Sequence, residues 1–214
     1  MKKYMIIILV FLLLLFLFTI NIRATRIEKI TENHFPLASK GSVYLKNTTG
    51  HIQIFSWDKN EVKMVAIKSV SKWGISYPEK FLDKIKIEII KNKNTIRINT
   101  RYPLFSWHKN ARVDYRLWVP ETASIYLESL YGNIHIKASL SSMSVKTDSG
   151  DVFLYFIEGI SCNLDIITIS GEICSEFNST IGNVSSRKIE WKIDQGKGNI
   201  KIKTISGNIS LLKL

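Results

Sequence analysis

The chain has 214 residues, of which 45% are hydrophobic, and this is enough for one or two domains with a real core. Its formal charge is +12 at pH 7, which would draw an envelope domain to anionic lipid headgroups or anionic wall polymers. The lysines are scattered, without the clustered patch or stacking aromatic surface that nucleic-acid binding needs, so we expect no nucleic-acid partner. A plainer interpretation stays open, in which lysines on exposed strand faces keep a sheet soluble and discourage edge pairing.

Residues 1–22 are expected to form an N-terminal membrane anchor or signal segment. Residues 4–20 are almost all apolar and carry no charge, and basic residues flank them on both sides. A helix of this length reaches about 26 Å, near the lower limit for crossing a bilayer. A cleaved signal peptide is the alternative, but the only cleavage site on offer, Ile22-Arg23-Ala24, is a weak one. We therefore favour one uncleaved transmembrane helix.

The orientation of this anchor does not follow from charge alone. Lys2 and Lys3 are opposed by Arg23, Arg26 and Lys29 on the other side of the apolar run. The position of the run at the start of the chain resembles an export signal, so we expect a single-pass membrane protein whose following domain lies outside the cytoplasm.

Residues 23–41 are expected to form a polar connector and residues 42–119 an N-terminal β subdomain. Residues 73–84 contain Gly74 and Pro78 and favour a loop or a short helix. Alternating apolar and polar residues predict strands in the rest of the subdomain, and the last two strands should form a hairpin through the turn at 91–94. These strands lie within Val43–Ile54, Val62–Lys68, Ile85–Ile89, Thr95–Asn99 and Val113–Val119.

This subdomain contains a short internal repeat, because the segment Phe55–Asn60 recurs with one change as Phe105–Asn110. Each copy carries a tryptophan, Trp57 or Trp107, which we expect to cover one end of the strand stack. A role in carbohydrate stacking is the alternative for these two side chains.

Residues 120–214 form a glycine-centred β-repeat region, whose motif also occurs once in the preceding subdomain. Each glycine has apolar residues seven and five positions before it and, with one exception at Ser175, two and four positions after it. The six glycines, which we interpret as structural turn glycines, are Gly50, Gly132, Gly150, Gly171, Gly198 and Gly207.

The residues between the apolar positions are largely polar, so the period is two and each segment is a strand with one buried face. Small hydroxyl residues usually precede the glycine, and Asp or Asn often follows it, which is turn chemistry. Each unit is then a strand, a tight turn and a strand, too small to bury a core without stacking on its neighbours. Near the end the spacing shortens from Gly198 to Gly207, and one strand is expected to serve both turns. The predicted fold is all-β, a β-solenoid-like stack preceded by one N-terminal transmembrane helix.

Two cysteines, Cys162 and Cys174, lie beyond the predicted membrane segment. Cys162 is in phase with the buried positions of its strand, whereas Cys174 is out of phase, so their side chains should leave opposite faces. We expect Cys162 to fill the core and no disulfide to form.

No constellation of reactive residues predicts an enzyme. The four histidines share no metal-ligand spacing, and His51 and His135 are expected to be exposed strand residues. Some β-helical enzymes place several carboxylates in a groove, but here only Asp151, Asp165 and Glu172 come near a common register. We expect no catalytic residues, no bound metal and no cofactor.

The order of the segments resembles the bacterial putative-adhesin family of unknown function, which is built from β-strand repeats. The resemblance covers about residues 42–213 and includes one strand that ends in Val-Pro. The segments that carry it are Gly50–Asp58, Val113–Pro120, Ser124–Ile134, Val145–Val152 and Thr204–Ile209. It implies an all-β, solenoid-like fold, an envelope location and often a membrane anchor, and it offers no catalytic residues.

Taken together, the sequence predicts a non-enzymatic, membrane-anchored, extracytoplasmic β-repeat protein that acts as a cell-envelope interaction module. Its expected partners are the membrane, through the N-terminal helix, and an anionic wall polymer, lipid headgroups or another envelope protein. Because the resemblance links some relatives to envelope stress, the alternative is an accessory regulator or sensor that acts through another membrane protein.

Overall fold

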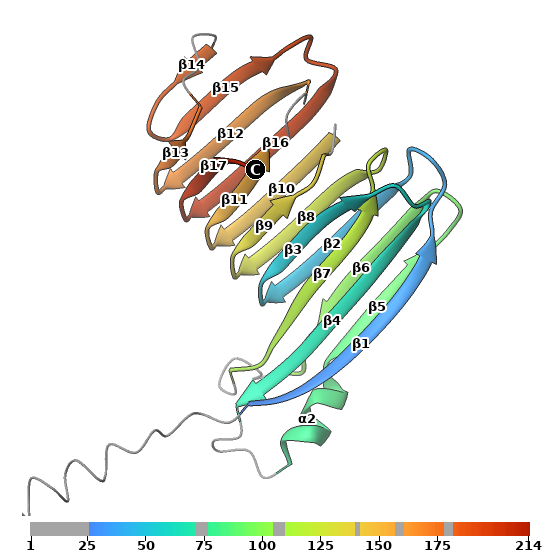
Figure 1. The fold of residues 1–214 in the computed structure, drawn as a ribbon. Helices are drawn as coiled ribbons and strands as arrows, with labels where there is room; N and C mark the ends of the chain where they lie inside the picture. Colours follow the sequence, from blue (N-terminus) through green and yellow to red (C-terminus); the bar gives the residue numbers. More distant parts are fainter. Residues whose placement is uncertain (1–25, 72–76, 105–109, 140–141, 157–160, 178–181) are drawn as a thin grey trace, which may run out of the picture.

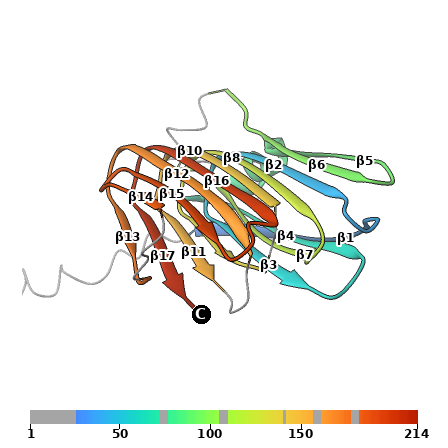
Figure 2. The ribbon, with the colours of Figure 1, turned by 90° about the horizontal axis from the view of Figure 1, so that it is seen from above.

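The computed structural model describes residues 26–71, 77–104, 110–139, 142–156, 161–177 and 182–214. The described chain is all-β except for one short helix, α2 (Pro78–Lys84), and its strands form two sheets that face each other (Figures 1 and 2). Among these residues no helix is long and apolar enough to cross a bilayer. The predicted anchor at 1–22 and Trp107 lie outside the described residues.

Sheet A has eight strands and sheet B has nine. In spatial order, sheet A consists of β1 (Arg26–Pro36), β4 (Glu61–Ser71), β7 (Arg112–Pro120), β3 (Ile52–Trp57), β9 (Ile134–Lys137), β11 (Val152–Phe156), β17 (Ile209–Lys213) and β13 (Ile173–Ser175). Sheet B consists of β14 (Gly182–Val184), β15 (Lys188–Ile193), β12 (Cys162–Ser170), β16 (Gly198–Ser206), β10 (Ser142–Ser149), β8 (Ser124–Tyr131), β2 (Ser42–Thr49), β6 (Thr95–Arg101) and β5 (Lys86–Lys91).

The central part of the stack repeats one unit, which we call a rung. A strand of sheet B ends in a tight turn and continues as a strand of sheet A, and strands of neighbouring rungs pair in parallel. In spatial order the rungs are β2–β3, β8–β9, β10–β11, β16–β17 and β12–β13. The last unit of the sequence therefore lies between two earlier ones, because β16 pairs with both β10 and β12.

The apolar positions of the repeat fill the space between the two sheets. Ile125, Val145 and Ile202 from sheet B, and Ile134 and Val152 from sheet A, are at most 1% exposed. The core is one continuous cluster from Phe35 to Leu211, so it spans the segments 42–119 and 120–214 without a break.

Antiparallel strands close the stack at both ends. At one end β1 pairs with β4 and β5 with β6, and at the other end β15 pairs with β12 and β14. The β5–β6 pairing confirms the predicted hairpin, and α2 falls within the segment predicted as a loop or short helix.

The prediction of a polar connector at 23–41 is wrong for residues 26–36, which form β1. This strand pairs with β4 along its whole length, from Arg26 opposite Ser71 to Pro36 opposite Glu61. The segment is mostly exposed and lacks the apolar alternation of a strand with one buried face. Hydrogen bonding to the edge of β4 and burial of Phe35 stabilise it as a strand.

Both cysteines are free thiols. Cys162 on β12 faces the core and is fully buried, and burial raises the pKa of its thiol to about 11. Cys174 lies on β13 of the opposite sheet and is exposed.

Candidate interaction surfaces

Five of the six predicted glycines stack at one edge of the molecule, where each rung turns from sheet B into sheet A. A Cβ atom on Gly132 would lie 2.2 Å from the carbonyl oxygen of Gly50, and one on Gly150 would lie 2.3 Å from that of Gly132. The same contact joins Gly207 to Gly150 and Gly171 to Gly207. The backbones thus approach too closely for any side chain at these positions.

Gly198 does not belong to this stack. It is the first residue of β16, buried, and its N–H donates to the Ser161 carbonyl. The preceding turn is made by Asp194 and Gly196, which have φ of 50° and 67°. One strand, β16, does lie between this turn and the turn at Gly207, as predicted. The turn before it is at Asp194–Gly196 instead of Gly198, and it joins two strands of sheet B.

Residues that follow the stacked glycines link the rungs through side-chain hydrogen bonds. The N–H of His51 donates to Asp114 Oδ1 (2.8 Å), and that of Asn133 donates to His51 Nδ1 (3.1 Å). The series continues from Asp151 N–H to Asn133 Oδ1 (3.1 Å), from Asn208 N–H to Asp151 Oδ1 (2.8 Å) and from Glu172 N–H to Asn208 Oδ1 (3.0 Å). We call this series the turn ladder.

A second polar row lies inside the stack, three residues before each glycine. Its members are buried, and they are Asn47, Ser129, Thr147, Thr204 and Thr168. Asn47 Nδ2 donates to the Val113 carbonyl and Thr168 Oγ1 to the Gly207 carbonyl, both at 2.9 Å. Asn47 and Thr168 therefore add side-chain bonds at the turns, whereas the buried hydroxyls of Ser129, Thr147 and Thr204 have no hydrogen-bond partner in the described part of the chain.

The outer face of sheet B carries two lysines side by side on central strands. Lys146 of β10 stands directly opposite Lys203 of β16, and both are exposed. Across the described residues neither lysine forms an ion pair. Glu128, which stands opposite Lys146 on β8, pairs with Lys46 (3.0 Å), and Asp165 pairs with Lys201 (2.9 Å). Like charges placed opposite each other destabilise a sheet, so this pair needs an explanation other than stability.

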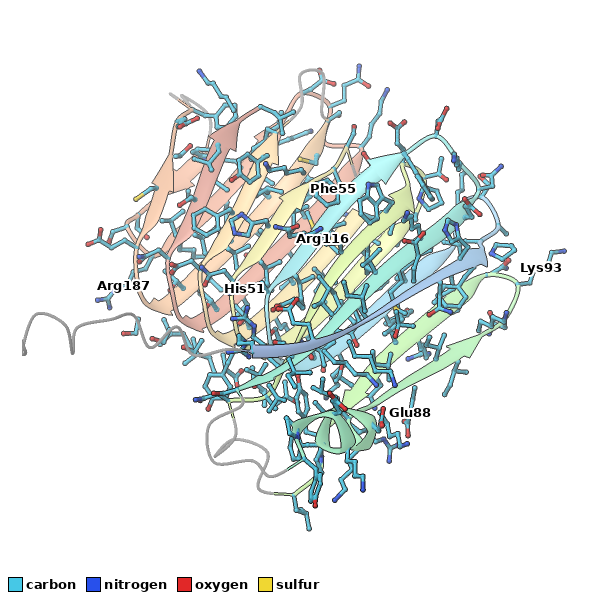
Figure 3. The ribbon with its side chains drawn as sticks, turned by 60° about the horizontal axis from the view of Figure 1, so that its bottom comes forward. His51, Phe55, Glu88, Lys93, Arg116 and Arg187 are labelled. Carbon is cyan, nitrogen blue, oxygen red and sulfur yellow. The ribbon has the colours of Figure 1, made fainter. Side chains whose placement is uncertain are left out.

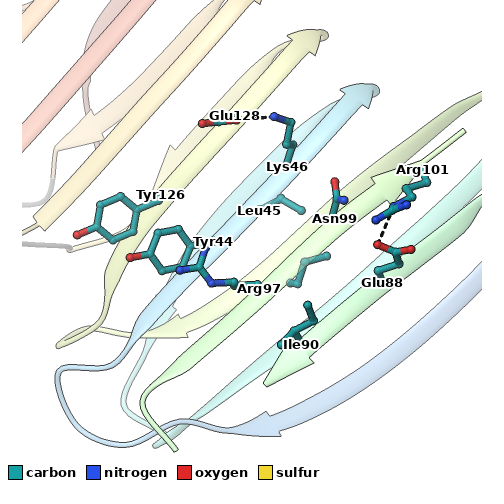
Figure 4. A pocket seen from close by; sticks show the side chains of 11 residues that line it. Tyr44, Leu45, Lys46, Glu88, Ile90, Arg97, Asn99, Arg101, Tyr126 and Glu128 are labelled. Atoms are coloured by element: carbon teal, nitrogen blue, oxygen red, sulfur yellow. Dashed lines mark ion pairs between the residues drawn. The ribbon is translucent and has the colours of Figure 1, made fainter. Parts of the chain in front are cut away.

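A groove of about 340 Å³ crosses the other end of the same face, over β5, β6, β2 and β8 (Figure 4). One side carries the rings of Tyr44 and Tyr126, stacked with centroids 4.4 Å apart, and the Arg97 guanidinium 4.3 Å from the Tyr44 centroid. The other side carries two ion pairs, Lys46 with Glu128 and Arg101 with Glu88. The charges of this groove are mostly compensated.

The outer face of sheet A carries aromatic rings and cations in register. Trp118 stacks on Phe55 with centroids 5.2 Å apart, and Lys63 lies over the Trp118 ring. His135 stacks on Phe153 with centroids 4.5 Å apart. Burial lowers the pKa of His135, and the neighbouring His51 and Lys137 lower it further.

The histidines expected to be exposed strand residues differ from each other. His51 is exposed at a turn, whereas His135 is half-buried on β9 beneath its ring contacts. Both histidines nevertheless line the same groove on the outer face of sheet A, together with residues of β7. Among the described residues, no cluster of three or more His, Cys, Asp or Glu side chains is arranged to hold a metal ion.

The three acids considered for a carbohydrate-cleaving site are not brought together. Asp151 belongs to the turn ladder, Asp165 is on the outer face of sheet B, and Glu172 follows the turn glycine of the outermost rung. Trp57 donates from Nε1 to the Glu61 carbonyl (2.8 Å), which fixes its ring against the β3–β4 turn.

The fold and these surfaces define a class of all-β proteins built from stacked rungs that expose two broad outer sheet faces. The model of the Toastrack DUF4097 family matches residues 20–212. The chain belongs to this family, as the resemblance of its repeats predicted.

Several solved structures are similar to the chain at low identity. A putative cell adhesion protein from Clostridium sporogenes is 14% identical, with a TM-score of 0.49, over 89% of this chain and 100% of that one. A putative adhesin from Bacteroides fragilis is 9% identical, with a TM-score of 0.24, over 87% of this chain and 97% of that one. No curated protein matches the chain. Likenesses this distant say nothing about what the present protein binds.

Apart from His51 and His135, sequence patterns did not single out the residues of the two grooves, and they did not single out the Lys146–Lys203 pair. The strands that carry these residues are far apart in the chain, and only the observed register places the side chains opposite one another. The sequence signal that could have helped to find these residues was the alternation of polar and apolar positions, because it shows which side chains face outward.

Proposed function

We propose that the protein is a non-enzymatic, membrane-anchored module of the cell envelope whose β domain lies outside the cytoplasm and binds an anionic polymer or headgroup layer through the outer face of sheet B. The observation that carries the proposal is that Lys146 and Lys203 stand opposite each other on two central strands and that neither forms an ion pair among the described residues. The net charge of +12 supports it, because a long-range positive field speeds encounter with an anionic surface.

Protection of a sheet edge does not account for this pair. Lysines guard sheets when they lie on edge strands, but β10 lies between β8 and β16, and β16 lies between β10 and β12. Asp148 lies two residues beyond Lys146 on the same face of β10 and forms no ion pair with either lysine in the described structure. A bound anion would supply the missing counter-charge.

The test is binding of the full-length protein, in neutral detergent, to a soluble anionic polymer and to vesicles with and without anionic lipid. We expect Lys146→Gln combined with Lys203→Gln to weaken binding about tenfold or more, since each basic residue near an anionic surface contributes about 1 kcal/mol. Binding by the unchanged protein should weaken as salt rises.

The matched control replaces Lys40 and Lys93, two exposed lysines in turns, by glutamine. It removes the same net charge and should reduce binding much less. Equal losses in both double variants, or binding that resists salt, would contradict the proposal, and the salt-resistant result would favour a packed protein contact of the accessory-regulator kind. The Lys146 and Lys203 double variant should also unfold at the same temperature as the parent or higher, because a like-charge contact is removed.

A further inference from the structure

A second groove, of about 300 Å³, lies on the opposite face of the molecule, on the outside of sheet A near the turns. Its polar lining comes from three neighbouring strands and their turns, and Figure 3 shows His51 and Arg116 on this face. The lining consists of Asp114 and Arg116 on β7, His51 and Gln53 at the start of β3, and Asn133 and His135 at the start of β9.

Apart from the Gln53 amide oxygen, the side-chain hydrogen-bond acceptors at the turns of this groove are already engaged. Asp114 accepts the His51 N–H at Oδ1 (2.8 Å), and its Oδ2 pairs with Arg112 Nε (3.0 Å). Asn133 Oδ1 accepts the Asp151 N–H, and His51 Nδ1 accepts the Asn133 N–H. The acidic group in the lining is therefore neutralised, and the accepting atoms of Asp114, His51 and Asn133 are engaged by the turn ladder.

The donors remain available. Because His51 Nδ1 accepts a hydrogen bond, its proton is on Nε2 in the neutral ring. The Asn133 side chain keeps both N–H groups of its amide. Arg116 is exposed and has no ion-pair partner among the described residues, and its neighbours across the sheet are Gln53 and Val65, which carry no charge.

The register sets three of these donors in a line. Arg116 stands opposite Gln53, and Gln53 stands opposite His135, so the side chains follow one another at the spacing of adjacent strands, about 4.8 Å. Stacking on Phe153 fixes the ring of His135. A groove that offers many donors, a free guanidinium and no free carboxylate selects an anion.

We propose that this groove binds a phosphoryl group, with Arg116 as its anchoring cation and His51, Gln53 and His135 as further donors. The planar guanidinium fork matches two phosphate oxygens at once, and a phosphate has enough oxygens to accept from both walls of the groove. The inference does not rest on the proposed function, because it concerns the other sheet and other residues.

Protonation of His135 should strengthen this binding. The other charged groups near the groove are Asp114 and Arg112 on β7, Lys137 on β9 and Asp151 beside β11. The pKa of free His135 is lowered by burial first, then by His51 and Lys137. A bound anion favours the imidazolium form, so phosphate should raise the pKa of His135. His51 contributes as a neutral donor, because its Nδ1 accepts the Asn133 N–H.

The test follows the ring signals of the histidines by NMR in the full-length protein in neutral detergent, while inorganic phosphate is added. We expect the signals of His51 and His135 to shift together and the titration of His135 to move to higher pH. Arg116→Gln should weaken the apparent affinity at least tenfold. His51→Asn serves to assign the signals and should fold, since Asn occupies the same turn position in other rungs, at Asn133 and Asn208.

Arg97→Gln is the matched control, because it removes one exposed arginine from the outer face of sheet B, and it should leave the shifts unchanged. No shift of either histidine up to about 10 mM phosphate, which would saturate a site with a Kd of about 1 mM, would overturn the proposal. Equal affinity in Arg116→Gln and the parent would overturn it as well.

Two competitors identify the source of the phosphoryl group. Soluble poly(glycerol phosphate) that reproduces the shifts at lower concentration than phosphate would identify an anionic polymer. Vesicles of phosphatidylglycerol that do so, while the polymer does not, would identify a lipid headgroup. Either result supports the site, and salt sensitivity at Lys146 and Lys203 is measured separately, so the two proposals fail independently.

Discussion

At the scale of one residue, the close contact between two rungs requires a glycine at position 150. Gly150 has φ of 145°, a backbone conformation that side chains rarely adopt, and a Cβ atom there would lie 2.3 Å from the carbonyl oxygen of Gly132. Both the conformation and the close approach require glycine. The oxygen belongs to the backbone of a paired rung, so no side-chain rotation can relieve the overlap.

Replacing Gly150 by alanine is expected to destabilise the fold by about 3 kcal/mol or more, because backbone strain and displacement of a neighbouring rung add together. Chemical denaturation of the parent and variant measures this cost. Ser149→Ala, one residue away at the same turn, is the control and should stay within about 0.5 kcal/mol. A Gly150→Ala variant as stable as Ser149→Ala would show that the rungs are not in contact at this edge.

The repeated glycine was predictable at residue level, but the exception was not. Gly198 has the same apolar spacing as Gly150, yet it begins a strand after a turn at Gly196. The spacing around Gly198 is satisfied by β15 and β16, two strands of the same sheet. Apolar spacing reports burial of one strand face, and it does not report whether the intervening turn crosses between sheets.

At the scale of elements, the rungs are tied by backbone pairing and by the turn ladder. Asp151 is central to that ladder, since its own N–H donates to Asn133 and its Oδ1 accepts from Asn208 (2.8 Å). This bond joins the β10–β11 rung to the β16–β17 rung, which comes from a distant part of the sequence. The ladder thus helps to hold the last unit of the sequence in its place between two earlier ones.

Asp151→Ala should weaken the junction of these two rungs by about 1 kcal/mol, the usual net contribution of a hydrogen bond. Hydrogen exchange at the Asn208 amide should become faster, while the Asn133 amide, whose acceptor is His51, should change little. Asp151→Asn retains an acceptor oxygen and should behave as the parent does. Unchanged exchange at Asn208 in Asp151→Ala would contradict the role assigned to the ladder.

Strand–turn–strand units, the β5–β6 hairpin and the burial of Cys162 could be predicted because they follow from local alternation. The strand β1 could not, because residues 26–36 are mostly polar and gain their conformation from the edge of β4. The order of the rungs also lay beyond local patterns, since β8, β10 and β12 have similar alternation and none of it shows that β16 lies between β10 and β12. Both surfaces proposed for binding depend on that order or on pairing between distant strands.

At the scale of the whole molecule, the arrangement directs interaction toward the sheet faces. Antiparallel strands cover both ends of the stack of parallel rungs (Figure 1). The edge strands are β1 and β13 in sheet A and β14 and β5 in sheet B. The outer faces are broad and carry the unpaired cations, Lys146 and Lys203 on sheet B and Arg116 on sheet A. The two faces point in opposite directions, so one molecule has two separate anionic contacts in this account.

The central claim is that this domain works outside the cytoplasm as an envelope interaction module, and its location is the most direct test. The measurement is protease accessibility of a C-terminal tag in intact cells, compared with lysed cells and combined with membrane fractionation. Our account predicts loss of the tag in intact cells while the protein stays in the membrane fraction and a cytoplasmic marker is protected. Protection of the tag until lysis would place the β domain in the cytoplasm and contradict the account.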